Sequence, residues 1–151
     1  MNKTIIHLIG GLGKGSGGAE KVLSQVICNT KEFKNIVITF RRGDCYRSQI
    51  ISCGGEIIEI NLNYTNILKL IKLVFLLITS INKNKVDVII GWMYHGSLIA
   101  GILGIFFRRK KIIWWIHNAE LDYKSTKRIT ILIAKLCGNI SNLFNRNLKI
   151  I

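Results

Sequence analysis

The sequence contains no proline, where an average usage of about 5% would give roughly 7 residues. Isoleucine, lysine and asparagine are abundant in every segment instead, which we interpret as a bias towards AT-rich codons rather than a structural message. No internal repeat or low-complexity linker interrupts the chain. With 151 residues, 49% of them hydrophobic and 20% charged, it has the size and composition of one globular domain, which excludes a disordered or fibrous protein.

Long hydrophobic runs are also missing. Residues 5–9 form a short apolar stretch that His7 interrupts and glycines follow, which is too short for a signal peptide. The longest apolar stretch, Ile67 to Ile81, has 15 residues and contains Lys69 and Lys72, whereas a membrane span needs about 20. The sequence therefore predicts no signal peptide and no transmembrane helix.

The four cysteines are scattered rather than grouped. Cys28, Cys45, Cys53 and Cys137 form no C-x-x-C pair and do not combine with histidines at metal-ligand spacing. We therefore expect free thiols in a reducing cytoplasm and no metal site.

Acidic residues are few, since 8 Asp and Glu face 22 Lys and Arg and leave a formal charge of +14. The basic residues include three clusters, at 41–42, 108–111 and 124–128. Such clusters are usually solvated faces. They are not interleaved with aromatic residues in one stripe and no nucleic-acid motif accompanies them, so we do not expect nucleic acid as a partner.

Short apolar runs rich in β-branched residues alternate with helical patterns. Strands are expected at 3–9, 35–40, 56–60, 86–91, 111–116 and 148–151, and helices from residue 18 and at 46–52, 66–83, 96–107 and 125–137. Nearly continuous apolar strands that alternate with helices indicate a parallel sheet covered on both faces, the doubly wound, Rossmann-like α/β class. His7 lies within the first strand and is expected to be a core residue with a satisfied ring nitrogen.

Five glycines lie in residues 10–17, between the first strand and the first helix. In an open α/β sheet, ligands bind beyond the carboxyl ends of the strands, and the helix N-terminus offers N–H groups to an anion. Gly13, Gly15 and Gly18 fit G-x-G-x-x-G, so an NADP-dependent oxidoreductase is one alternative; arginines at 41–42, rather than an acidic residue, would then meet the 2′-phosphate. A loop that only connects strand to helix is another alternative.

Three segments together resemble the N-terminal domain of family 4 glycosyltransferases. Gly17–Leu23 reads GGAEKVL after the glycine-rich loop, Asp87–His95 reads DVIIGWMYH before a small-residue helix, and Trp114–Asn118 reads WWIHN. The three occur in the family's order, and the resemblance runs from about residue 4 to 138. It implies the N-terminal half of the two-domain GT-B fold and retaining glycosyl transfer.

The resemblance also implies what the rest of such an enzyme contains. The family places its nucleotide-sugar site, with a pair of glutamates, in a C-terminal domain of similar size that we expect to be absent from these 151 residues. The expected partners are a nucleotide-sugar donor, a lipid-linked or glycan acceptor and an anionic membrane surface. No cofactor and no metal are expected.

Particular residues receive roles from the resemblance. His117 matches the histidine that contacts the donor sugar and is the expected catalytic residue. Substrate-binding roles are expected for the glycine loop and for three side chains: Gly13, Gly15, Gly17, Gly18, Glu20, His95 and Asn118. For Glu20 a capping role at the first helical turn is an equal alternative. Trp114 and Trp115 alternate across a strand, so one should be core and the other should approach the cleft.

The sequence therefore predicts the acceptor-side domain of a glycosyltransferase that builds a polysaccharide or lipopolysaccharide. Its expected place is the cytoplasm, at the inner face of the cytoplasmic membrane, and the chain alone is expected to be inactive. A non-catalytic binding domain or truncated fragment is the second alternative.

Overall fold

The computed structural model describes residues 3–13, 18–60, 67–116, 128–141 and 148–151. Its six strands are all parallel, in the order β3-β2-β1-β4-β5-β6. They are β1 (Thr4–Ile9), β2 (Lys34–Thr39), β3 (Glu56–Glu59), β4 (Val88–Trp92), β5 (Lys111–Trp115) and β6 (Leu148–Ile150). The predicted doubly wound, Rossmann-like sheet is confirmed, and the strand order reverses between the neighbouring strands β1 and β4.

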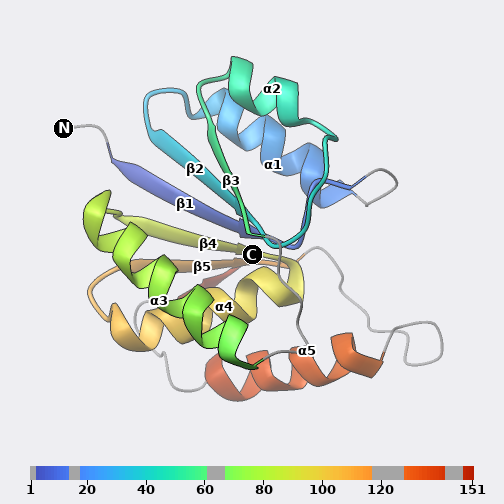
Figure 1. The fold of residues 1–151 in the computed structure, drawn as a ribbon, viewed down its shortest axis with the longest axis vertical. Helices are drawn as coiled ribbons and strands as arrows, with labels where there is room; N and C mark the ends of the chain where they lie inside the picture. The colour runs from blue at the N-terminus through green and yellow to red at the C-terminus, as the bar shows by residue number, and fades with distance from the viewer. Residues whose placement is uncertain (1–2, 14–17, 61–66, 117–127, 142–147) are drawn as a thin grey trace.

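Five helices cover the sheet (Figure 1): α1 (Gly18–Asn29), α2 (Arg47–Ser52), α3 (Ile67–Lys83), α4 (Met93–Phe106) and α5 (Arg128–Ser141). Helices α1 and α2 lie on one face, and α3, α4 and α5 lie on the other. Every predicted element exists. The largest differences are the end of α5, which continues to Ser141 instead of ending at Cys137, and the start of α4, which follows β4 directly at Met93 instead of beginning at Gly96. None of the helices in the described ranges is both long and apolar enough to cross a membrane.

The alternation of side chains along β1 divides the core into two clusters. Ile6 and Leu8 pack with α3, α4 and α5, whereas Ile5 and Ile9 pack beneath α1 and α2 with Leu23 and other apolar side chains. Both clusters are buried because every strand near the centre of a parallel sheet is covered on both faces. The carboxyl ends of β1, β2 and β4 therefore meet at one edge, which we call the carboxyl edge.

His7 is a core residue, as predicted, and it lies on the α1–α2 face. Its Nε2 is 3.0 Å from Asn35 Oδ1, and its Nδ1 accepts a hydrogen bond of 3.2 Å from Trp92 Nε1. Because the indole can only donate, Nδ1 is the acceptor and Nε2–H is the donor to Asn35. Complete burial lowers the pKa of His7 to about 4, although the bond to Asn35 acts in the opposite direction.

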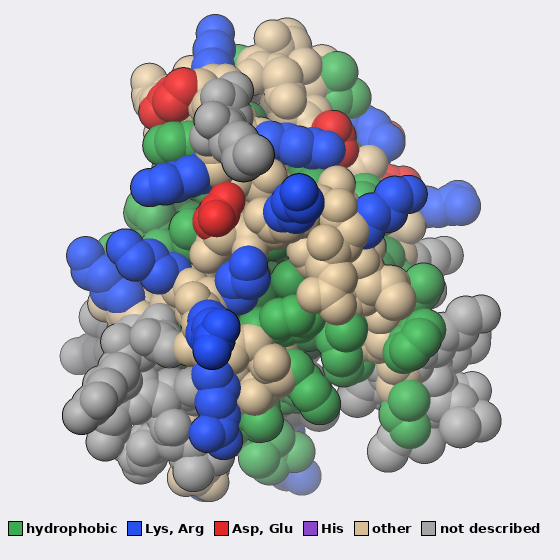
Figure 2. Space-filling model, turned by 90° about the vertical axis from the view of Figure 1, so that its left-hand side faces the viewer, with side chains coloured by type: hydrophobic (Ala, Val, Ile, Leu, Met, Phe, Trp, Pro, Cys, Tyr) green, Lys and Arg blue, Asp and Glu red, His purple; other side chains and the backbone are tan. Residues whose placement is uncertain are grey.

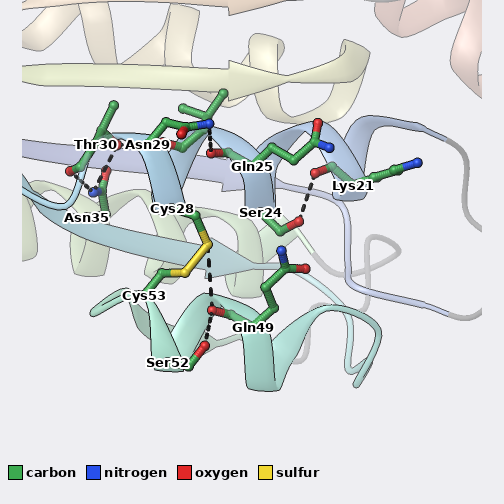
Figure 3. Close-up of a disulfide and its surroundings, with 11 residues drawn as sticks. Lys21, Ser24, Gln25, Cys28, Asn29, Thr30, Asn35, Gln49, Ser52 and Cys53 are labelled. Carbon is green, nitrogen blue, oxygen red and sulfur yellow. Dashed lines mark hydrogen bonds between the residues drawn. A yellow bond between two sulfur atoms is a disulfide. The ribbon is translucent and has the colours of Figure 1, made fainter.

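The expectation of four free thiols is wrong for two cysteines. Cys28 in the last turn of α1 and Cys53 at the end of α2 form a disulfide, with their Cα atoms 5.0 Å apart (Figure 3). The packing of α2 against α1 brings them together, and their separation of 25 residues in the sequence carries no signal of this contact. Cys45 and Cys137 are free, and burial raises the pKa of the Cys137 thiol to about 11.

Candidate functional site

Two loops meet at the carboxyl edge, one after β1 and one after β2. A Cβ on Gly43 would lie 2.3 Å from the backbone of Leu12, so only glycine allows the second loop to lie directly on the first. The Cys45 N–H donates a 2.9 Å hydrogen bond to the Leu12 carbonyl. A Cβ on Gly11 would lie 3.1 Å from the Arg41 Cβ. The backbone of residues 10–13, which we call the glycine segment, is thus packed directly against the loop that follows β2 and carries the two arginines.

Beside this contact lies an open cavity of about 260 Å³. Its walls combine backbone from the glycine segment with three charged side chains: Gly10, Gly11, Gly13, Glu20, Arg41 and Arg42. Two of the predicted binding residues, Gly13 and Glu20, line this cavity, and their role in binding stays a prediction. Arg41 and Arg42 are exposed, and from the sequence they are interpreted as a solvated cluster, as part of a basic surface that meets an anionic membrane, or as a partner for a 2′-phosphate.

Glu20 occupies an unusual environment for a carboxylate. It lies in the first turn of α1 and is only 7% exposed. Its Oε2 is buried and has no hydrogen-bond partner among the described residues. A helix N-terminus favours a negative charge nearby, so the position of Glu20 in the first turn of α1 has the favourable interaction with the helix dipole that the capping alternative expects. An unpartnered buried carboxylate oxygen nevertheless has a desolvation cost, which is reduced when a ligand supplies a donor.

His95 lies in the first turn of α4, close to the same two loops. It is half-buried, and its pKa is lowered first by this burial and then by the positive charge of Arg41. The neutral imidazole is therefore favoured, with one nitrogen that donates and one that accepts. The prediction that His95 follows β4 at the carboxyl edge is confirmed, and its role in binding an acceptor stays a prediction.

The tight start of α4 fixes this position. A Cβ on Gly96 would lie 2.1 Å from the Leu8 carbonyl oxygen, so the helix lies directly against β1. Met93 has a φ of 56°, in the left-handed region that non-glycine residues rarely adopt. Such conformations concentrate at functional sites, because the surrounding structure must hold them in place. The close contact at Gly96 and the left-handed conformation of Met93 together place the start of α4, with His95, at the carboxyl edge.

The tryptophans of β4 and β5 behave partly as predicted. Trp114 is buried on the α4 face, where a Cβ on Gly101 would lie 2.8 Å from its ring. Trp115 points to the other face and stacks on Trp92, with ring centroids 4.8 Å apart. Because Trp92 also donates its hydrogen bond to His7, these contacts form a continuous row of rings on the α1–α2 face. The row leads from the centre of the sheet to the carboxyl ends of β4 and β5.

Several predicted residues lie outside the described part of the chain. These are the catalytic candidate His117, the neighbouring Asn118 and two glycines of the loop, Gly15 and Gly17. Gly18 is the first residue of α1, and a Cβ there would meet nothing within 4 Å. The structure thus leaves the roles of these residues as predictions, while it places Gly18 with open space beside it.

Two of the basic clusters lie at opposite edges of the sheet. Arg41 and Arg42 are at the carboxyl edge, whereas Arg108, Arg109 and Lys110 precede β5 at the amino edge and Lys111 is its first residue. The third cluster, at 124–128, lies outside the described residues except for Arg128, the first residue of α5. Figure 2 views the molecule from the side on which the strands begin, and Lys and Arg side chains are spread over it. A hollow of about 390 Å³ there is lined by three apolar and three basic residues: Ile105, Phe106, Phe107, Arg108, Arg109 and Lys110. It is larger than the first cavity, but it lies away from the residues at the carboxyl edge.

Sequence comparison identifies no relative, since neither a protein-family model nor a curated protein matches the chain. Solved structures do match. Anabaena Alr3699/HepE in complex with UDP and glucose superimposes with a TM-score of 0.62, at 15% identity, over 99% of this chain and 44% of HepE. The complex of HepE with UDP-glucose gives a TM-score of 0.60, at 16% identity, over 97% of this chain and 43% of HepE. The likeness shows a shared fold, and this chain spans less than half the length of HepE.

Proposed function

We propose that these 151 residues are the acceptor-side half of a retaining GT-B glycosyltransferase of the family 4 type. The observation that carries the proposal is the cavity at the carboxyl ends of β1 and β2, where Gly13, Glu20 and two arginines meet beside the N-terminus of α1. The fold that holds this cavity matches HepE, whose structures contain UDP with glucose and UDP-glucose. In the proposed enzyme, a sugar is transferred from a nucleotide donor to a lipid-linked or cell-surface glycan.

The chemistry follows from the charges that develop during transfer. The sugar becomes positively charged and the nucleotide diphosphate departs with negative charge, so donors fixed near the leaving group stabilise the transition state. The N–H groups of the first turn of α1 suit this task, because the first N–H groups of a helix have no partner within the helix, and the glycines before it allow backbone to come close to a phosphate. We propose His117 as the residue that contacts the donor sugar and Asn118 as a partner for sugar hydroxyls.

The donor's remaining contacts are proposed to come from a second domain. The chain spans 44% of HepE, and the family resemblance places the nucleotide-sugar site in a C-terminal half. We therefore expect no sugar transfer from UDP-glucose by the 151-residue chain alone, with no metal required by the complete enzyme. Robust turnover by the isolated chain would contradict this part of the proposal.

We propose an anionic membrane as a further partner, at the inner face of the cytoplasmic membrane. Phe106 is 62% exposed and adjoins Arg108 and Arg109 at the amino edge, so an apolar ring and positive charges face the same way. Each basic residue near an anionic surface contributes about 1 kcal/mol. The chain should sediment with vesicles that contain phosphatidylglycerol and not with neutral vesicles, and replacing 108–110 with glutamine should weaken this binding.

Nuclear magnetic resonance of the 15N-labelled chain tests the donor side. UDP and UDP-glucose should move the amide signals of Gly11, Gly13 and Gly18, whereas NADPH should leave them in place. Gly18→Ala adds a methyl group where the fold has room but where a phosphate must approach, so it should weaken the response several-fold. Gly138→Ala, also in open space, is the matched control. A response to NADPH with none to UDP-glucose would favour the oxidoreductase instead.

A further inference from the structure

The Cys28–Cys53 disulfide is a covalent link between α1 and the end of α2 (Figure 3). Helix α2 has six residues, of which only Ile50 is buried, and a helix this short depends on tertiary contacts for its stability. Arg47 at its start forms an ion pair of 2.6 Å with Glu59, but the two side chains are partly exposed, and such pairs contribute little. The disulfide therefore supplies a large part of what holds α2 in place.

The disulfide lies within reach of a reductant. Cys28 and Cys53 are partly exposed, and Cys28 Sγ is 4.0 Å from the Gln49 carbonyl oxygen in a contact at the surface of the protein. Exposed disulfides are the labile and regulatory ones, whereas structural disulfides resist reduction by glutathione. In the cytoplasm, where we propose that this protein acts, disulfides are rare, and those that occur are usually transient and catalytic or redox-sensing. The position of this disulfide therefore favours a bond that is made and broken over one that is permanent.

Helix α2 continues directly from the loop that packs on the glycine segment. The Cys45 N–H donates a 2.9 Å hydrogen bond to the Leu12 carbonyl, and α2 begins two positions later. Tyr46, between them, has a φ of 61°, in the left-handed region that a non-glycine residue adopts only where its surroundings hold it. Arg41 and Arg42 precede this contact in the same loop and line the cavity. A movement of α2 is therefore transmitted to one wall of the cavity.

We infer that the Cys28–Cys53 disulfide is a redox switch for the cavity at the carboxyl edge. The oxidised pair fixes α2 on α1 and so keeps the β2 loop on the glycine segment. Reduction releases α2, and the loop that carries Arg41 and Arg42 loses order with it, so a ligand must order that loop when it binds. The inference rests on the proposed function only in naming the ligand, a nucleotide sugar, whose affinity falls on reduction.

The reductant is a dithiol, and the exchange balances with no other reactant. One thiolate of the dithiol attacks the sulfur of Cys28 or Cys53, the S–S bond breaks, and the other cysteine leaves as a thiolate. The second thiol of the reductant then attacks the mixed disulfide and releases the first cysteine. Overall, two electrons and two protons pass to the protein and the reductant becomes a disulfide, so an oxidised dithiol reverses the reaction.

Backbone order parameters of the 15N-labelled chain, measured with and without dithiothreitol, test the switch apart from any ligand. On reduction the order parameters of Gly43 and Cys45 should fall from about 0.85, the value of rigid backbone, to below about 0.6, while those of Ile6 in β1 and Ile112 in β5 stay high. Unchanged order at Gly43 and Cys45 would overturn the inference. Loss of the strand signals would overturn it as well, because the release must be confined to α2 and its loop.

Titration with UDP-glucose, followed at the amide signals of Gly11 and Gly13, tests the effect on the cavity. The reduced chain should bind roughly threefold more weakly or worse, because binding must then order the loop. Cys28→Ser/Cys53→Ser should bind as weakly as the reduced chain and should not respond to dithiothreitol. Cys45→Ser removes a free thiol but keeps the backbone hydrogen bond, so it should retain the full difference. Equal affinity of the oxidised and reduced chains would contradict the switch.

The disulfide must also respond to the redox state of a cell. In a glutathione buffer poised like the cytosol, Cys28 and Cys53 should be mostly reduced, and in an oxidising glutathione buffer they should be mostly disulfide-bonded. Maleimide labelling of the acid-quenched chain, read by mass spectrometry of its peptides, measures both fractions. A pair that stays oxidised in the first buffer is a structural disulfide and would end the case for a switch.

The outcome is distinguishable from failure of the proposed function. If Gly43 and Cys45 lose order on reduction and UDP-glucose binds neither state, the redox switch of the loop stands and the donor side of the proposed function is wrong. If UDP-glucose moves the glycine signals equally in both states and the two residues keep their order, the inference fails and the glycosyltransferase proposal stands.

Discussion

The two faces of the sheet are built differently. Beneath α1 and α2 lie five buried polar or charged side chains, His7, Glu20, Ser24, Asn35 and Thr39, and the disulfide joins the two helices that cover them. The opposite face is packed mostly by apolar side chains and by glycines that let α4 lie against β1 and Trp114. The first face should therefore respond most strongly to redox state and pH, and the second mainly to packing.

Loss of the disulfide should have the largest effect. A crosslink that closes a loop of 25 residues restricts the unfolded chain by about 3.5 kcal/mol in the chain-entropy model. Reduction should lower the free energy of unfolding by about that amount in urea titrations. Cys28→Ser/Cys53→Ser should be equally destabilised and insensitive to reductant, whereas Cys45→Ser should keep the full response. Equal stability with and without reductant would remove the redox part of the contrast between the faces.

Acid should act on the α1–α2 face through His7. Its pKa is about 4 in the folded protein against 6.5 for the ordinary group, so below pH 6.5 the unfolded chain binds a proton that the folded chain does not. Stability is therefore full above pH 6.5 and falls by about 3 kcal/mol by pH 4. His7→Gln should flatten the part of the pH profile between these values, measured by urea unfolding. His95, whose pKa is also lowered, leaves a smaller slope of the same sign.

Packing should control the α4 face. In Gly96→Ala the new methyl group would lie 2.1 Å from the Leu8 carbonyl oxygen, and the backbone must move, which should cost roughly 2–3 kcal/mol. Gly138→Ala in α5 is the control, because nothing lies within 4 Å and alanine favours a helix by about 1 kcal/mol. Thermal denaturation of both variants would show a contrast in sign. A stable Gly96→Ala would mean that α4 does not lie this close to β1.

The smallest expected effect is a gain. Thr39 is 1% exposed and its Oγ1 has no hydrogen-bond partner among the described residues. Thr39→Val keeps the shape of the side chain and removes this hydroxyl, so it should stabilise the protein by about 1 kcal/mol. A loss of stability instead would show that the hydroxyl has a partner, and that the polar groups of this face form a more complete network.

Local patterns in the sequence determined the elements and the fold class. Continuous β-branched runs between helical patterns are enough to specify a parallel sheet with helices on both sides, because both features depend on neighbouring residues. The glycine segment and His95 were singled out from their positions just beyond predicted strands, and Glu20 from its place in the first turn of the predicted helix and in the family resemblance; their roles stay predictions. The start of α4 was placed too late, because the close contact of Gly96 with β1, which lets the helix follow β4 directly, joins residues far apart in the sequence.

Only the tertiary structure decided which distant groups meet. The Cys28–Cys53 disulfide depends on how α2 packs on α1, and the cavity depends on Gly43 lying against Leu12. Arg41 and Arg42 looked like a solvated pair until that contact placed them beside the same cavity as Glu20. A sequence of this length fixes local conformation through each residue's own neighbours, but a binding site is made by side chains from separate loops, and their distances exist only once the chain has folded.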